Sequence, residues 1–264
     1  MFARIVATMI TLTFVARLVG GGVCLADPNW GNLTGTFVFD GVAPPPKALV
    51  VNKDQEFCGR FGAVDESLIV NKRNGGIKNI VVYLYSKPDG PQPKVHPGYA
   101  KTATSEVVFD NIRCRFVPHV VLLRTTQTLL LKNSDAVGHN AKIETRANSA
   151  ANPLIRAGSV LKRKFDAPER LPCRASCNLH PWMTAWVVIK DHPYVAVTDE
   201  NGRFSINGLP VGEWTFQFWH EQQGYIQKVK MNGATVDWQS GRTAIQIAPG
   251  TKDLGTIATR IEGE

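Results

Sequence analysis

The chain has 264 residues and a formal net charge of +8 at neutral pH. This length suffices for one large β domain or for two smaller domains that each bury a core, and two is our starting expectation. The basic residues form no dense run and no basic helix, so the charge favours an acidic protein partner or an anionic surface and argues against nucleic-acid binding.

Residues 1–26 have the order of a secretory signal peptide. An early arginine precedes an apolar stretch from Ile5 to Ala16, and small residues lead to a predicted cleavage after Ala26. Arg17 interrupts the apolar stretch and disfavours a stable membrane span, although an uncleaved anchor and a lipid-modified Cys24 stay open as alternatives. We therefore expect an exported protein, periplasmic or extracellular.

The rest of the chain reads as an all-β protein. Short apolar alternations bounded by Gly, Pro, Asn and Asp recur, helix periodicity is hard to find, and the proline-rich stretches 42–49 and 86–98 fit loops. This pattern suits a Greek-key sandwich. The expected strands are Gly35–Phe39, Ile80–Leu84, Glu106–Phe109, His119–Leu123, Thr128–Lys132, Val160–Phe165, Arg174–Cys177 and Ala185–Ile189.

The pattern changes after Lys190. Polar turns at 199–202 and 208–212 separate alternating runs typical of hairpins. We expect a boundary near residue 191, with a first domain at 27–190 and a smaller β-sandwich domain at 191–264. Through TDENGRFSINGLPVGEW, the second segment resembles the carboxypeptidase regulatory-like (transthyretin-like) β domain, and it shows no catalytic constellation.

The stretch CNLHPWM, which begins at Cys177, holds a thiol, an imidazole and a thioether within one short loop. Copper that alternates between two oxidation states suits a thiolate, two imidazoles and a weak thioether, a set that favours neither state fully. Cys177, His180 and Met183 supply three of these donors. The second imidazole is expected from a neighbouring strand, and the stretch NSDAVGHN offers His139.

Together, NSDAVGHN and CNLHPWM resemble the corresponding segments of the cupredoxins, the plastocyanin-like and amicyanin-like blue copper proteins. The resemblance covers residues 116–190, and the earlier strands complete the sandwich. It implies a Greek-key cupredoxin fold in which the four donors bind one type 1 copper ion. It also implies that the Asn140 side chain pins the ligand loop.

Trp182 lies inside this loop, between His180 and Met183. In cupredoxins the exposed edge of such a histidine, ringed by apolar side chains, is the usual port for electrons. The resemblance therefore implies that Trp182 flanks the one ligand that reaches solvent, where a redox partner docks through a small and weak interface. The implied function is electron transfer without catalysis, with a cytochrome or a dehydrogenase as partner.

Cys173 permits a second interpretation, because CRASC followed by HPWM also resembles the dinuclear purple copper motif. That motif places one residue more between its second cysteine and its histidine than this sequence does. In an extended strand the sulfurs of Cys173 and Cys177 lie about 13 Å apart, too far to share an ion or to form a disulfide. Cys58 and Cys114 are then the natural disulfide pair, with a bridge from Cys173 to either of them as the alternative.

The remaining histidines leave other functions open. His119 is either a strand-end histidine capped by a carbonyl or a donor to a second metal with His192 or His96. A copper oxidase or a nitrite reductase would need such additional ligands near an open position. A copper chaperone or surface-binding protein is a further alternative, against which the low methionine count of the mature chain, Met183 and Met231, argues.

Overall fold

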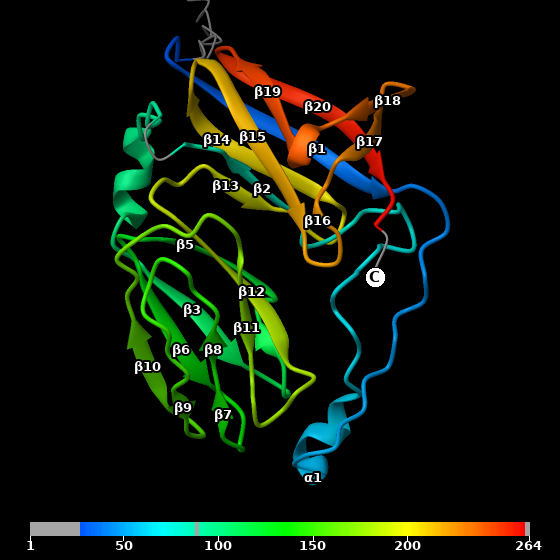
Figure 1. The fold of residues 1–264 in the computed structure, drawn as a ribbon, viewed down its shortest axis with the longest axis vertical. Coiled ribbons are helices and arrows are strands. Elements are labelled where there is room, and N and C mark those ends of the chain that lie inside the picture. The colour runs from blue at the N-terminus through cyan, green and yellow to red at the C-terminus, as the bar shows by residue number, and fades with distance from the viewer. Residues whose placement is uncertain (1–26, 88–89, 262–264) are drawn as a thin grey trace, which may run out of the picture.

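The computed structural model describes residues 27–87 and 90–261, so the predicted signal peptide lies outside the described residues. Within these residues the chain is almost entirely β, as predicted, and it forms two stacked sandwiches (Figure 1). No helix in this part of the chain has the length and apolar character needed to cross a membrane. The short helical elements are α1 (Gln55–Cys58), η1 (Gly59–Phe61), η2 (Pro97–Thr102) and η3 (Gln239–Gly241).

The upper sandwich in Figure 1 takes its strands from both ends of the described chain, and we call it the split sandwich. In one sheet, β1 (Trp30–Phe39) lies between β14 (Arg203–Pro210), which is antiparallel to it, and β20 (Gly250–Thr259), which is parallel. In the other, β2 (Val81–Leu84) pairs with β13 (Val195–Val197) and β15 (Gly212–His220). The remaining strands are β16 (Gly224–Tyr225), β17 (Lys228–Met231), β18 (Ala234–Asp237) and β19 (Arg242–Ile247).

The lower sandwich lies within residues 106–190, and we call it the inserted sandwich. One sheet has the order β10-β6-β3-β4 and the other the order β5-β12-β11-β8, and a small ribbon of β7 and β9 lies beside them. All eight predicted strands are present in the two sandwiches; most ends are shifted by one or two residues, and β1 begins five residues before the predicted start at Gly35. The strands of the inserted sandwich are β3 (Glu106–Asn111), β4 (Phe116–Val117), β5 (Val120–Arg124), β6 (Thr128–Asn133), β7 (His139–Asn140), β8 (Lys142–Ile143), β9 (Leu154–Ile155), β10 (Val160–Arg163), β11 (Cys173–Ser176) and β12 (Thr184–Lys190).

The sheets do not follow the predicted division at residue 191. Both β1 and β2 precede that boundary, yet each is hydrogen-bonded to strands that follow it. On β1 the side chains of Leu33 and Phe37 are fully buried in the core of the split sandwich. The predicted first domain, residues 27–190, therefore includes two strands that pair in the split sandwich, because strand pairing joins segments that lie far apart in sequence.

A third apolar cluster joins the two sandwiches. Successive side chains of a strand point to opposite faces of its sheet. On β5, Val121 and Leu123 point into the inserted sandwich, while Val120 and Leu122 lie in the joining cluster. The facing strand β2 alternates likewise, which explains why its four residues are all buried. The other residues of the cluster are Val81, Tyr83, Trp186, Val188, Val195, Val197, Trp219 and Tyr225.

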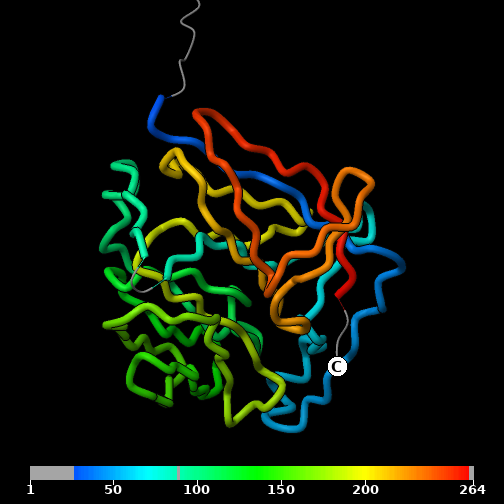
Figure 2. The backbone as a smooth tube through the Cα atoms, turned by 45° about the horizontal axis from the view of Figure 1, so that its top comes forward, coloured from blue at the N-terminus to red at the C-terminus, as the bar shows by residue number. Residues whose placement is uncertain are grey.

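Between β1 and β2 the chain makes a long excursion. It leaves the split sandwich, runs beside the inserted sandwich to α1, and returns (Figures 1 and 2). A disulfide between Cys58 and Cys114 fastens α1 to the inserted sandwich, which confirms the predicted pair. Val51 and Phe57 pack against the same core. We call residues 51–61, which include α1 and η1, the strap.

Candidate metal centre

The predicted donors come from two places in the inserted sandwich. His139 lies on β7, while Cys177, His180 and Met183 lie in the loop that joins the antiparallel strands β11 and β12. Two backbone hydrogen bonds close this loop: the N–H of Cys177 donates to the carbonyl of Met183 at 3.3 Å, and the N–H of Met183 donates to the carbonyl of His180 at 2.9 Å. Residues far apart in sequence are therefore brought to one end of the sandwich.

Three of the four donors converge. One ligand atom each from His139, Cys177 and His180 lies within 4.8 Å of the other two. The Sγ atom of Cys177 is 3.7 Å from Nδ1 of His180, and the centroids of the two imidazole rings are 4.6 Å apart. Both imidazoles are fully buried and the thiol is 2% exposed, so bulk solvent does not reach these donors.

Each imidazole is held by a carboxylate on the same ring atom. Nε2 of His139 lies 3.0 Å from Oδ2 of Asp135, and Nε2 of His180 lies 2.8 Å from Oδ2 of Asp54. A carboxylate on one ring nitrogen fixes the tautomer and orientation of a metal-binding histidine and makes its other nitrogen a better ligand. Accordingly, Nδ1 of His139 is buried and has no hydrogen-bond partner.

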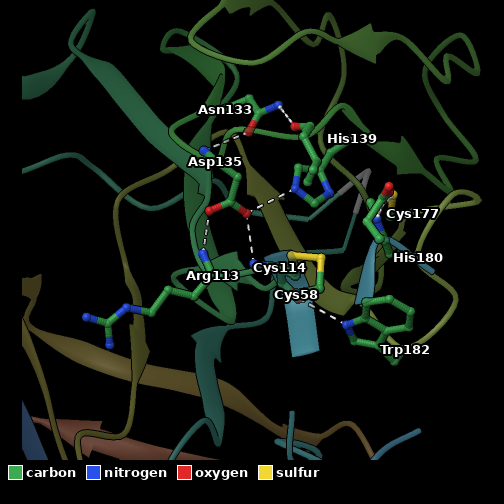
Figure 3. Close-up of a disulfide and its surroundings, with 11 residues drawn as sticks. Cys58, Arg113, Cys114, Asn133, Asp135, His139, Cys177, His180 and Trp182 are labelled. Carbon is green, nitrogen blue, oxygen red and sulfur yellow. Dashed lines mark hydrogen bonds and ion pairs between the residues drawn. A yellow bond between two sulfur atoms is a disulfide. The ribbon is translucent and has the colours of Figure 1, made fainter. Parts of the chain in front are cut away.

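Asp135 is itself held by the backbone next to the disulfide. Its carboxylate accepts hydrogen bonds from the N–H groups of Arg113 at 2.6 Å and Cys114 at 2.8 Å, and its own N–H donates to the side chain of Asn133 (Figure 3). Burial acts to raise the pKa of Asp135, but the hydrogen bonds from His139 and from these N–H groups outweigh it and lower the pKa. Asp135 is therefore an anion that orients His139.

The thiol of Cys177 is prepared to ionise. Burial acts to raise its pKa, but the nearby imidazoles of His139 and His180, together with the N–H of Asn140, which donates to the sulfur at 3.4 Å, outweigh burial and lower the pKa to about 6. The thiolate is the form that binds a metal. At neutral pH the site therefore presents a thiolate between two imidazoles.

Asn140 ties the ligand loop to β7. Its side-chain oxygen accepts hydrogen bonds from the N–H groups of Asn178 at 2.9 Å and Leu179 at 3.3 Å, both within the loop. Its amide nitrogen donates to the side chain of Asn152. These contacts are those expected of a residue that pins the loop.

Trp182 and Met183 are the last two residues of the loop between β11 and β12. Met183 is 2% exposed and packs in the core of the inserted sandwich. The ring of Trp182 contacts that of His180, with centroids 5.1 Å apart. The expectation that His180 reaches solvent is wrong, because the strap places Asp54 on its outer edge and leaves the side chain fully buried.

The other predicted cysteine and histidines lie elsewhere. Cys173 is buried and reduced, and burial raises its pKa to about 12, so it stays a neutral thiol. His119 places Nε2 2.5 Å from Glu221, so a carboxylate and not the expected carbonyl binds it. Nδ1 of His192 accepts from the N–H of Tyr194 at 3.2 Å, and Nδ1 of His96 accepts from the N–H of its neighbour Gly98. His119, His192 and His96 therefore each contact a different group.

Sequence reasoning missed both carboxylates. Asp135 lies within NSDAVGHN, four residues before His139, so its position gave a signal that the prediction did not use. Asp54 is separated from His180 by 126 residues and belongs to a loop-like stretch, so no local pattern points to it.

The donor set suits copper. Copper sites of the electron-transfer type combine a thiolate, two imidazoles and a weak thioether. Here the thiolate, one imidazole and the thioether belong to one loop, and the second imidazole belongs to β7. The unpartnered Nδ1 of His139 and the lowered pKa of Cys177 both fit a metal ion between these side chains. A second group, formed by Cys114, Asp135 and His139, lacks a thiolate, because the sulfur of Cys114 is in the disulfide.

No family model matches the sequence, and no curated protein matches it. The solved structures that resemble the fold include cupredoxins. A reduced Cu(I) form of an amicyanin mutant is 19% identical, with 41% of this chain and 98% of that chain covered and a TM-score of 0.30. A purple cupredoxin from Nitrosopumilus maritimus is 18% identical, with 33% and 99% covered and a TM-score of 0.27.

A copper-containing nitrite reductase from Thermus scotoductus is 15% identical, with 40% of this chain covered and a TM-score of 0.29. The match spans only 25% of the length of that enzyme. These similarities concern part of the chain, and they include both a protein named as a cupredoxin and one named as an enzyme. The resemblance of 191–264 to a carboxypeptidase regulatory-like domain stays a prediction.

Proposed function

We propose that this protein is an exported electron carrier that binds one type 1 copper ion through His139, Cys177, His180 and Met183. The observation that carries the proposal is the convergence of a thiol of lowered pKa and two carboxylate-held imidazoles within 4.8 Å. When bound, copper would supply the chemistry by accepting and releasing a single electron. The protein would transform no substrate itself.

The residues of the chain would keep the ligands in place in both oxidation states. Backbone hydrogen bonds close the loop, Asn140 ties it to β7, and Asp135 and Asp54 orient the imidazoles. Ligands fixed by packing and hydrogen bonds change little on electron transfer, so little reorganisation is needed. The disulfide between Cys58 and Cys114 agrees with an oxidising compartment, which supports export.

A redox protein, such as a cytochrome or a dehydrogenase, is the proposed partner. Because Asp54 covers the edge of His180, we expect the partner to approach the ligand loop at Trp182, which is half-buried and contacts His180, and at the exposed Pro181 beside it. An aromatic side chain next to a ligand suits a small interface that forms and separates quickly.

Titration of the metal-free protein with Cu(II) tests the proposal. We expect one equivalent to bind and to produce an intense visible band from charge transfer between the thiolate and copper. Cys177→Ala should abolish the band. Cys173→Ala is the matched control and should keep it, because Cys173 is a neutral buried thiol outside the group of donors.

A colourless copper complex would overturn the assignment of a type 1 site. Binding of more than one copper ion, with the second lost in Cys173→Ala, would favour the dinuclear alternative. Turnover of nitrite or of a phenol would favour an enzyme. Rapid transfer of copper to an acceptor, without a reversible couple in voltammetry, would favour a chaperone.

A further inference from the structure

The edge of His180 that faces away from Cys177 is covered by a segment that belongs to neither strand of the ligand loop. The strap reaches it from the excursion between β1 and β2, and Oδ2 of Asp54 lies 2.8 Å from Nε2 of the imidazole. Asp54 itself is 36% exposed, whereas the imidazole is fully buried. The carboxylate therefore lies between the imidazole and solvent.

The backbone of the strap is shaped to present this carboxylate. Asp54 has a φ of 46°, in the left-handed region that non-glycine residues rarely occupy. Its carbonyl accepts hydrogen bonds from the N–H groups of Phe57 at 3.0 Å and Cys58 at 2.8 Å, which closes the turn into α1. A residue held in this conformation by its surroundings points to a functional constraint at the position.

The disulfide connects the two carboxylates that hold the imidazoles. On one side, Cys58 donates its N–H to the turn that carries Asp54. On the other, Cys114 donates its N–H to Asp135, the partner of His139 (Figure 3). The carbonyl of Cys114 also accepts from Nε1 of Trp182 at 3.2 Å, so the same residue contacts the ligand loop.

We propose that Asp54 is a positioning residue of the metal centre and that the disulfide-anchored strap is a fixed cover over His180, which controls access of solvent and of chelators to that ligand. This inference rests on the proposed copper function for its effect on metal binding. The cover itself is a property of the metal-free chain. The two parts are therefore tested separately.

Chemical modification of the metal-free protein tests the cover. Diethyl pyrocarbonate acylates accessible imidazole nitrogens, and peptide mapping by mass spectrometry reports His180 separately from the other histidines. We expect His180 to be protected in the unaltered protein and to react at least about tenfold faster in Asp54→Gly, because the site opens to solvent more often. Glycine keeps the positive φ, so the substitution removes the carboxylate without straining the turn.

Two variants sharpen this test. Asp54→Asn should preserve the protection, because its side-chain oxygen can still accept from Nε2–H and asparagine tolerates the left-handed backbone. Glu56→Ala removes the same charge from an exposed neighbour on α1 and should change nothing. Replacing both Cys58 and Cys114 by serine should expose His180 as Asp54→Gly does. If this double variant does not fold, Asp54→Gly by itself still tests the cover.

Copper affinity tests the positioning role. Loss of a carboxylate that orients a metal-binding histidine typically lowers metal affinity about 10- to 100-fold. We expect Asp54→Gly to lose copper to a competing chelator in this range and to shift the reduction potential, with Asp54→Asn close to the unaltered protein. Equal reactivity of His180 in all variants would overturn the cover, and equal copper affinity would overturn the positioning role. Failure of the unaltered protein to bind copper would instead refute the proposed function and leave the modification result standing.

Discussion

The indole rings of Trp186 and Trp219 pack edge to face, with centroids 4.6 Å apart, and join the two sandwiches. Trp186 lies on β12 of the inserted sandwich and Trp219 on β15 of the split sandwich. Glu221 adds polar contacts, since its carboxylate accepts from Nε1 of Trp186 at 2.8 Å and lies 2.5 Å from Nε2 of His119. The two sandwiches therefore share a buried contact that is both apolar and hydrogen-bonded.

Removing this contact should destabilise the protein strongly. We expect Trp219→Ala to lower the free energy of unfolding by about 3 kcal/mol or more, because truncating a buried tryptophan leaves a cavity. Trp219→Phe should retain most of the stability. Urea unfolding followed by circular dichroism measures the difference, and an unchanged midpoint for Trp219→Ala would show that the sandwiches do not depend on this contact.

Asn140 should matter for the ligand loop more than its neighbour Asn152 does. Asn140→Ala leaves the N–H groups of Asn178 and Leu179 without their acceptor, so the loop that carries the donors is less well fixed. We expect copper affinity to fall about 10- to 100-fold, as measured by competition with a chelator. Asn152→Ala removes only the other partner of Asn140 and should have a smaller effect; equal losses would contradict the role of the side-chain oxygen.

His220 should make the protein less stable in mild acid. It is fully buried, and burial lowers its pKa from 6.5 to about 4. Below pH 6.5 the unfolded chain takes up a proton that the folded chain refuses, so stability that is fully present above pH 6.5 is lost as the pH falls towards 4. The loss from this residue is up to about 3 kcal/mol.

Urea unfolding at neutral pH and at about pH 5 measures this loss of stability. We expect the decrease in stability between the two conditions to be smaller in His220→Gln, because glutamine does not titrate. His192, whose pKa burial also lowers to about 4, contributes in the same direction in both proteins. An identical decrease with and without the substitution would assign the acid sensitivity to other groups.

The segment 191–264 should not fold by itself. Without β1, strands β14 and β20 lose the partner between them, and the core loses the buried side chains of Leu33 and Phe37. We expect this segment to give a poorly dispersed amide NMR spectrum, while residues 27–264 give a dispersed one. A well-dispersed spectrum of the short segment would mean that β1 and β2 are dispensable.

The sequence allowed prediction of the features that depend on local pattern. Alternating apolar residues located the eight predicted strands, and the spacing of Cys177, His180 and Met183 indicated a tight loop, because a tight loop brings nearby residues together. His139 required only one further step, a histidine on an adjacent strand. The structure brings it within 4.8 Å of the donors of Cys177 and His180.

What escaped prediction depends on contacts between distant segments. Strand β1 alternates as any edge or central strand does, and nothing in its own residues tells which sheet it joins. Asp54 is an acid in a polar stretch, and only the fold places it on His180, 126 residues away. The wrong expectation of an exposed His180 has the same origin, because the family resemblance contained no counterpart of the strap.

The inserted sandwich lies in sequence between β2 and β13, two strands that pair antiparallel in the split sandwich. Tyr83 lies opposite Val195, so the two connections between the inserted sandwich and the split sandwich start from adjacent strands. An insertion point with close ends is the kind that accepts another domain without disturbing the host sheet. The inserted sandwich is nevertheless not self-contained. Asp54, the carboxylate that holds His180, lies in the segment between β1 and β2, outside residues 106–190, so the excised sandwich would lack it.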